Sequence, residues 1–206
     1  MSGHLRMGAI STELGETIPY VLATLRSACP KLHLQVVPGT SQQLYEGLNL
    51  GTLDLAVTVR PDFALPKSRN VTVLKKQKHM LLTPRGMKGS LEEILEKHPF
   101  IRYDARSWGG EKLESYLRTL RIDRNILCDI DSLETIAVMV GNGMGVSVVP
   151  EWSGIDLHKF RLNKVQMAQE AGSREICVIH NLPAKLPKVI ELITEICQTH
   201  ASKTDT

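Results

Sequence analysis

The sequence predicts an α/β protein made of two lobes, each a parallel sheet flanked by helices. Residues 5–59 alternate short apolar strands with amphipathic helices, and a second alternation of the same kind runs from about residue 90 to residue 150. Between the two sets lie strand-like stretches joined by a basic segment. Short links between alternating strands and helices are typical of parallel sheets with right-handed crossovers. Two small α/β lobes are therefore expected within one chain.

Length and composition exclude several classes of protein. A chain of 206 residues fits one large domain or two small lobes. The formal net charge of +3 is too small to predict nucleic-acid binding from electrostatics alone, and three Phe, two Trp and four Tyr are too few for a base-stacking surface. No apolar run approaches the roughly 20 residues that span a bilayer, and no signal peptide is recognisable. We expect a cytoplasmic protein without membrane association.

The first set of elements is bounded by turn and capping residues. Strands are predicted over 5–10, 32–36 and 53–59, and helices over 18–29 and 40–50. Pro30 stops the first helix, Thr40 or Ser41 caps the second, and Gly51 suits its left-handed C-terminal position. The third strand is mostly apolar, which is typical of a strand covered on both faces.

The joining segment has two interpretations. Residues 71–74 and 80–83 are strand-like, and Lys75, Lys76, Lys78 and His79 separate them. The basic residues could form a solvated strand edge, or the chain could cross here between the two lobes.

The second set follows the same rhythm as the first. Strands are predicted over 100–103, 126–130, 146–149 and 175–180, and helices from Ser90, over 113–120, from Asp131 and from Pro187. The capping boxes Ser90–Glu93 and Asp131–Glu134 begin two of these helices. Residues 151–173 predict no clear element.

No motif indicates catalysis, a cofactor or a metal. The glycines of segment 141–145 follow a helix and precede a strand, the reverse of a nucleotide-binding loop, so they predict the end of a helix. The four cysteines are widely scattered and are best interpreted as reduced thiols. No nucleophile, base and orienting group form a recognisable set. We therefore expect neither an enzyme nor a bound cofactor or metal.

Polar residues gather where the predicted strands end. In α/β sheets ligands bind beyond the carboxyl ends of strands, where helix N-termini converge. The residues at these ends are Ser11, Thr12, Thr40, Ser41, Arg60, Arg106, Ser107, Asp131 and Ser132. They predict a pocket for a polar or anionic ligand. The alternative is that the hydroxyls only cap helices, a role that Ser and Thr fill constantly.

An ordered series of landmarks resembles the effector-binding domain of the LysR-type transcriptional regulators. The landmarks are residues 5–11, Ile18-Pro19, Cys29-Pro30, Pro38-Gly39-Thr40 with Leu44, the run Gly-Thr-Leu-Asp-Leu-Ala-Val at 51–57, Pro99-Phe100-Ile101, and residues 143–151. The resemblance covers residues 5 to 198. It implies a fold similar to type 2 periplasmic binding proteins: two Rossmann-like lobes joined by two crossover strands, with a ligand cleft between them.

The resemblance also implies boundaries and site residues. One effector-binding domain would fill residues 1–206, with lobe I at about 5–75 and 170–200 and lobe II at about 76–169. The implied effector-binding positions are Ser11, Thr12, Thr40, Ser41, Arg60, Ser107, Trp108 and Ser132. Pro38 and the Trp108-Gly109-Gly110 segment depart from the family pattern, which leaves the identity of the effector open.

The implied function is ligand sensing rather than catalysis. The domain would bind a small polar or anionic metabolite and transmit binding to DNA-binding domains, so that DNA contact belongs to an N-terminal helix-turn-helix absent from these residues. A homodimer is expected, with helix 18–28 packed on helix 113–120 of the partner, and a tetramer is a further option for the full-length protein. The alternatives are a free-standing solute-binding protein and an enzyme on the same two-lobed scaffold.

Overall fold

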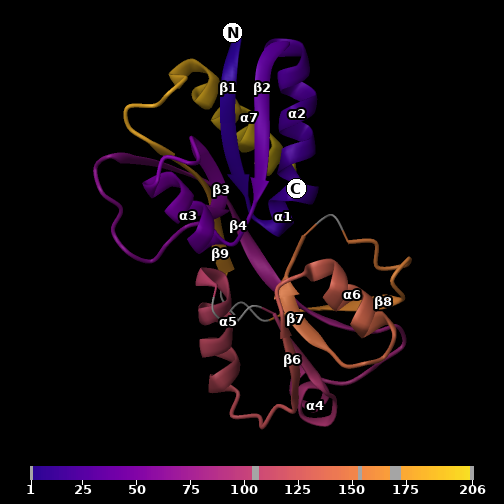
Figure 1. Cartoon of the computed structure of the whole chain (residues 1–206). Coiled ribbons are helices and arrows are strands. Elements are labelled where there is room, and N and C mark those ends of the chain that lie inside the picture. The colour runs from indigo at the N-terminus through magenta and orange to yellow at the C-terminus, as the bar shows by residue number, and fades with distance from the viewer. Residues whose placement is uncertain (1, 104–106, 153–154, 168–172, 205–206) are drawn as a thin grey trace. The chain divides into compact units, whose positions relative to one another are not determined.

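A computed structural model describes residues 2–103, 107–152, 155–167 and 173–204 (Figure 1). The chain divides into two compact units: unit 1 comprises Met1–Lys76 and Glu175–Thr206, and unit 2 comprises Gln77–Arg174. Both divisions fall inside strands, namely β4 (Arg69–Pro84) and β9 (Ser173–Asn181). None of the helices in the described ranges combines the length and the apolar character that crossing a membrane requires.

Unit 1 is built on three parallel strands and one antiparallel strand. The parallel strands are β1 (Ser2–Ala9), β2 (Lys31–Pro38) and β3 (Leu55–Val59), and β9 runs antiparallel to β3. The strand order is β2-β1-β3-β9-β4, which leaves β2 at an edge. Leu5 lies opposite Leu34, and Met7 lies opposite both Val36 and Leu55. This register gathers the apolar side chains on one face, as the alternation in the sequence predicts.

Helices cover both faces of this sheet. They are α1 (Ser11–Gly15), α2 (Thr17–Ala28), α3 (Ser41–Asn49) and α7 (Pro187–Thr204). A Cβ on Gly8 would lie 2.7 Å from Leu44 Cδ2, so glycine lets α3 approach the sheet closely. Helix α2 packs on α7, where the rings of Tyr20 and His200 stack 4.7 Å apart.

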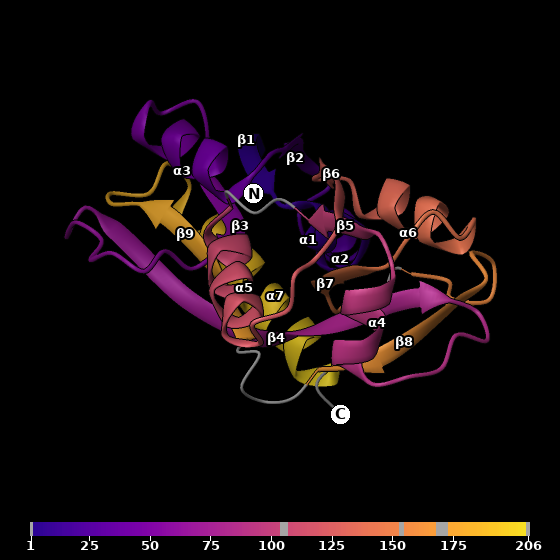
Figure 2. The same ribbon diagram turned by 90° about the horizontal axis from the view of Figure 1, so that it is seen from below.

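Unit 2 combines an antiparallel group of strands with a parallel pair (Figure 2). The second half of β4 pairs with β7 (Ser147–Pro150) and β8 (Leu162–Gln166), and β5 (Phe100–Tyr103) pairs in parallel with β6 (Ile126–Ile130). Its helices are α4 (Leu91–Lys97), α5 (Trp108–Thr119) and α6 (Leu133–Gly141). Each begins at a Ser cap: Ser90, Ser107 and Ser132.

Strand β4 supplies apolar side chains to two separate cores of unit 2. Met80 and Leu82 join the cluster that contains the buried residues of α6, whereas Leu81 joins the cluster of α4 and α5. Successive side chains of a strand point to opposite faces, so one strand separates the two clusters. Alternate residues of β4 therefore enter different hydrophobic clusters, one on each face of the strand.

The predicted fold class is confirmed. The capping box expected at Asp131–Glu134 is wrong, because α6 is capped by Ser132, which bonds to the Thr135 amide. Two further differences concern the strands. Residues 71–74 and 80–83 belong to the single strand β4, because the basic segment between them continues the strand. Lys75, Gln77 and His79 are buried while Lys76 and Lys78 are exposed. The sequence pattern did not reveal this alternation of buried and exposed residues, because the buried side chains are polar. The second difference is β8, which lies in the region that predicted no element.

The glycines of segment 141–145 end a helix, as predicted. Helix α6 stops at Gly141, and Gly143 adopts a φ of 74°, which favours glycine. The Met144 amide donates to the Met139 carbonyl at 3.1 Å, which closes the helix end.

Candidate functional site

The carboxyl ends of the parallel strands in unit 1 meet at one edge of the sheet. Ala9, the last residue of β1, lies opposite Pro38 of β2 and Val57 of β3. The Gly39 amide donates to the Ala9 carbonyl at 3.3 Å, and the Ile10 amide donates to the Val57 carbonyl at 3.2 Å. The loops that follow these strands therefore start side by side. Because they carry Ser11, Thr12, Thr40, Ser41 and Arg60, the structure places this predicted set along one sheet edge.

The two hydroxyl residues after β1 have different surroundings. Thr12 is buried, and its hydroxyl donates to Glu13 Oε1 at 3.5 Å. Ser11 is half-buried, and in the described part of the chain its hydroxyl makes no hydrogen bond with another side chain or backbone group. Ser11 is thus the better candidate for direct ligand contact, whereas Thr12 holds the helix start in place.

The two hydroxyl residues after β2 are both engaged in the fold. Thr40 Oγ1 accepts from the Gln43 amide at 3.3 Å, and the Thr40 amide donates to Gln43 Oε1 at 2.9 Å, which completes a capping box. Ser41 is buried and its Oγ accepts from the Val59 amide at 3.3 Å. The contact ties the start of α3 to the end of β3. Capping, the alternative interpretation of these hydroxyls, therefore describes Thr40 fully.

Arg60, the positive charge of this edge, is paired with a residue from the far end of the sequence. Its Nη1 donates to Glu175 Oε2 at 2.8 Å, and its amide donates to the Glu175 carbonyl at 2.8 Å. Both side chains are substantially exposed. A ligand at this edge would meet a cation and a carboxylate together, so a charged group on the ligand must compete with the pair.

A buried charge cluster lies beneath α1. Lys75 Nζ contacts Glu13 Oε1 at 3.3 Å and Glu16 Oε1 at 2.7 Å, and all three side chains are almost fully buried. Thr17 Oγ1 donates to the second oxygen of Glu13. Burial, reinforced by the charge of Glu13, raises the pKa of nearby Cys197 to about 12. The cluster fastens α1, which carries Ser11, to strand β4.

The predicted residues of unit 2 lie at helix starts. Ser107 Oγ accepts from the Gly110 amide at 3.0 Å, and Ser132 Oγ accepts from the Thr135 amide at 3.2 Å and from Thr135 Oγ1 at 2.9 Å. Trp108 is the half-buried first residue of α5. Arg106, which was also expected to offer charge, lies outside the described residues.

The start of α5 packs on a buried arginine that sequence reasoning missed. A Cβ on Gly109 would lie 2.9 Å from Arg174 Cδ, so only glycine fits without a shift. Arg174 Nε donates to Gln77 Oε1 at 2.7 Å. Both residues are strand residues within unit 2.

Sequence reasoning also missed Glu13, Glu16, Lys75 and Glu175. The pattern of the sequence gave no signal for the first three, because charged residues are normally assigned to the surface. Glu175 was hidden for a different reason: 115 residues separate it from Arg60, and only the antiparallel pairing of β3 with β9 joins them.

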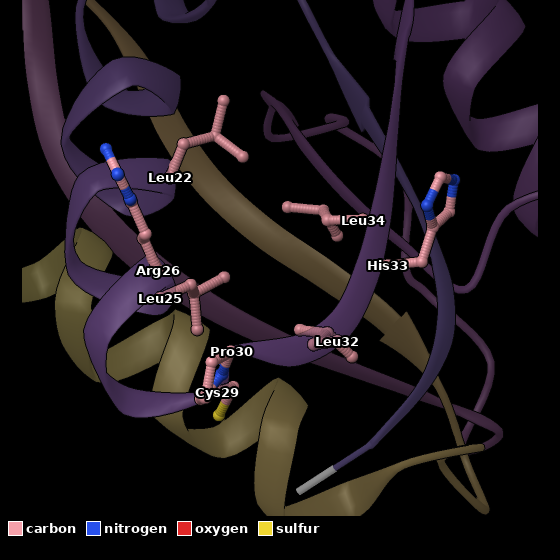
Figure 3. Close-up of a pocket in the computed structure, with 8 residues that line it drawn as sticks. All are labelled: Leu22, Leu25, Arg26, Cys29, Pro30, Leu32, His33 and Leu34. Atoms are coloured by element: carbon pink, nitrogen blue, oxygen red, sulfur yellow. The ribbon is translucent and has the colours of Figure 1, made fainter.

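A further unpredicted feature of unit 1 is an open groove of about 550 Å³ between α2 and β2 (Figure 3). The lining residues are Leu22, Leu25, Arg26, Cys29, Pro30, Leu32, His33 and Leu34. In Figure 3 the side chains of Leu22, Leu25 and Leu34 point into the space between the helix and the strand. The groove is mainly apolar, unlike the polar edge at the ends of β1, β2 and β3.

The described side chains form no metal-type cluster, and their thiols are free. Within the described ranges no three His, Cys, Asp or Glu side chains come together as metal ligands. The four cysteines are free thiols, as predicted, and burial raises the pKa of Cys177 to about 12. A thiol with so high a pKa is a poor nucleophile near neutral pH.

A model of the LysR substrate binding domain family matches residues 1–202. The chain belongs to this family. The match covers almost the whole chain, including both compact units.

Relatives of similar sequence are named as transcriptional regulators. SsuR of Burkholderia cenocepacia, an HTH-type transcriptional regulator, is 28% identical over 72% of this chain and 49% of its own length. LrrA of Synechococcus elongatus, a probable regulator of this type, is 23% identical over 91% of this chain and 58% of its own length. The chain thus spans about half the length of such relatives.

The solved structures support the fold. The LysR-family regulator HinK of Pseudomonas aeruginosa has a TM-score of 0.81 at 24% identity, over 99% of this chain and 71% of that one. The effector-binding domain of QuiR in complex with shikimate has a TM-score of 0.81 at 15% identity, over 98% and 99%. The cofactor-binding domain of Cbl has a TM-score of 0.83 at 18% identity, over 97% and 89%. The fold is that of LysR effector-binding domains, similar to type 2 periplasmic binding proteins.

Proposed function

We propose that this effector-binding domain senses a small polar or anionic metabolite and transmits its binding to DNA-binding domains. The observation that supports this most is the shared sheet edge of unit 1, where three parallel strands end side by side and deliver Ser11, Thr40, Ser41 and Arg60. Strand ends with helix starts are where α/β proteins bind ligands.

The residues are proposed to divide into contact and support roles. Ser11 offers an open hydroxyl and Arg60 a guanidinium, while Thr12, Thr40 and Ser41 hold the loops. The family resemblance adds a further group from unit 2 to the effector-binding residues: Ser107, Trp108 and Ser132. Neither a cofactor nor a catalytic step belongs to this proposal, because the relatives are named as regulators of transcription.

A thermal-shift screen tests the proposal. The panel contains small carboxylates, amino acids, aromatic acids and inorganic oxyanions. A ligand at 100 times its Kd adds about 2.7 kcal/mol to the free energy of unfolding, which raises the melting temperature measurably. A panel in which no member shifts the transition would count against a ligand of this class.

Ser11→Leu tests the site with the hit from that screen. The bulkier side chain should weaken binding at least tenfold, because it fills the edge and removes a hydroxyl. Ser27→Leu, at an exposed position of α2, is the matched control and should bind as the unmodified protein does. Equal affinity in both variants would place the ligand elsewhere.

We infer a homodimer in which α2 and the adjacent groove contribute the contact. Leu22 is 42% exposed on α2, whereas Tyr20 of the same helix stacks on His200. Helix α5 is the matching surface predicted from the sequence; its Leu113 and Leu117 are buried in unit 2, so the contact would use its exposed face. Exposed apolar residues elsewhere in unit 2 would extend this surface: Ile126, Leu127, Val138 and Met144.

Light scattering tests the dimer. At micromolar concentration the mass should be twice 22.9 kDa, and Leu22→Asp should shift it toward the monomer. Leu50→Asp, at a position that is 71% exposed on α3's end, should leave the mass unchanged. A mass near 23 kDa for the unmodified chain would overturn the dimer.

For the whole protein we propose that the DNA contact is made by a region outside these 206 residues and that the regulator acts in the cytoplasm. The names of the relatives support both points, because they are HTH-type regulators about twice as long as the matched segment. A tetramer remains an option for the full-length protein.

A further inference from the structure

Two histidines face each other on neighbouring strands of unit 1. The register of β1 and β2 places His4 directly opposite His33. Neighbouring strands lie about 4.8 Å apart, and the two ring centroids are 4.9 Å apart with the ring planes inclined by 15°. Both side chains are exposed. The register alone therefore brings two imidazoles together at one strand spacing.

We propose that His4 and His33 form a two-imidazole site for an exchangeable divalent cation of borderline softness, of which Zn²⁺ is the probe. A neutral imidazole offers one ring-nitrogen lone pair, and this ligand suits Zn²⁺, Cu²⁺ and Ni²⁺. Two nitrogens that share a tetrahedral Zn²⁺ at about 2.1 Å lie about 3.4 Å apart. Rings stacked at 4.9 Å reach that separation by tilting toward each other, a rotation that exposed side chains permit.

The surroundings leave both rings available. In the described ranges neither ring makes a hydrogen bond or an ion pair that metal binding would break. On the same face Arg6 is bound to Asp54 at 3.3 Å and to the Gly51 carbonyl at 2.6 Å. Exposed Lys31 is the neighbouring positive charge that opposes binding. With two protein ligands, water must complete the coordination, so the ion should exchange readily.

Metal binding at this place would fasten the edge of the sheet. Strand β2 is an edge strand with no fully buried residue, and β1 is its hydrogen-bonded neighbour. An ion held by one ligand from each strand binds more tightly when β1 and β2 are paired than when the two strands are separated. Zn²⁺ should therefore raise the melting temperature of the protein.

Calorimetric titration with Zn²⁺ tests the site, using the full chain with Cys128→Ser so that the half-buried thiol does not compete. We expect one ion per chain. His4→Gln and His33→Gln should each weaken binding at least tenfold and remove the Zn²⁺-dependent thermal shift, and the double variant should add little to either. His158→Gln, at an exposed position in unit 2, is the control and should bind normally.

Two results would overturn the proposal. One is the absence of a Zn²⁺ site that depends on His4 and His33. The other is a loss of binding with His4→Gln but not with His33→Gln, since the ion would then be held by the N-terminal segment rather than across the strands. Far-UV circular dichroism of each variant confirms that the fold is retained.

Discussion

The two units give their buried carboxylates different numbers of cationic partners. In unit 1 two carboxylates, Glu13 and Glu16, share the single ammonium of Lys75. In unit 2 the single carboxylate of Glu114 faces one buried and one exposed guanidinium group: Arg124 Nη1 donates to it at 3.2 Å, and Nε of the exposed Arg118 lies 3.9 Å away. A buried charge is costly when its partner is lost. Unit 1 thus depends on one cation, whereas Glu114 retains a second partner.

The thiols show the largest expected contrast between the units. Burial raises the pKa of Cys177 and of Cys197 in unit 1 to about 12, so both are thiols rather than thiolates at pH 8. Cys128 in unit 2 is half-buried. In native protein a thiol reagent should modify Cys128 first and leave the other two untouched until unfolding. Mass spectrometry of labelled peptides measures this, and labelling of Cys177 as fast as Cys128 would contradict the burial argument.

Removal of Lys75, the cation of the buried cluster in unit 1, should have the largest effect on stability. Lys75→Met leaves two buried carboxylates without a counter-charge and should lower the free energy of unfolding by about 3–5 kcal/mol. Urea denaturation measures the loss. Lys78→Met, at an exposed position of the same strand, should change it by no more than about 0.5 kcal/mol. Equal effects of both variants would show that the cluster is not buried in solution.

Loss of the Glu114–Arg124 pair in unit 2 should lower the free energy of unfolding by less, and the contribution of this pair should depend on pH. Burial alone would raise the pKa of Glu114, but the hydrogen bonds and charge of Arg124 outweigh burial and lower the pKa below 4.5. The ionised form therefore stabilises the fold above pH 4.5, and the contribution is lost as the pH falls through the lowered pKa. Glu114→Gln should cost about 2 kcal/mol at pH 7.

The difference between the unmodified protein and Glu114→Gln should shrink as the pH is lowered from 7 to 3. Glu96→Gln, at an exposed position of α4, is the control and should show no such change. A difference that grows toward low pH would mean that the pKa of Glu114 is raised rather than lowered.

The smallest expected effect on stability belongs to the exposed pair of unit 1. Arg60→Gln should change the free energy of unfolding by only about 0–1 kcal/mol, because water screens an exposed ion pair. Its effect should appear in ligand affinity instead. Arg60→Gln should lower the affinity for an anionic effector, and Glu175→Gln should raise it. Titration of both variants with the same ligand decides this, and parallel changes in the two would contradict competition between ligand and Glu175.

The sequence predicted those parts of the fold in which apolar side chains are buried and polar side chains are exposed or cap helices. Leu5, Met7 and Ala9 alternate because one face of β1 is buried, and Ser90 with Glu93 marks a helix start because a helix needs its amides capped. The pattern failed at Lys75 and His79, where a strand buries polar side chains. There the tertiary surroundings, rather than the local sequence, decide which side chains are covered.

For the candidate site, the sequence predicted the positions of the residues but not their roles. Strand ends could be read from the chain, so Ser11, Thr40 and Arg60 were found. The individual roles of the hydroxyls could not be predicted, since a cap and a ligand contact use the same hydroxyl. Contacts that the structure shows separate these roles, such as the capping box of Thr40 and the bond of Ser41 to the Val59 amide. Arg60 gained its partner Glu175 through strand pairing, which no local pattern reports.

The strand order has a consequence for how the protein is made. Strand β9 lies between β3 and β4 in the sheet, yet it is synthesised last among the strands. Unit 2 is one uninterrupted stretch, Gln77–Arg174, so it can fold as soon as it leaves the ribosome. Unit 1 must wait, with the edges of β3 and β4 unpaired, until residues 175–181 arrive to fill the gap. Within these 206 residues the unit whose synthesis starts first is therefore the one completed last. A nascent chain stopped before residue 175 would expose the unpaired edges of β3 and β4 to chaperones.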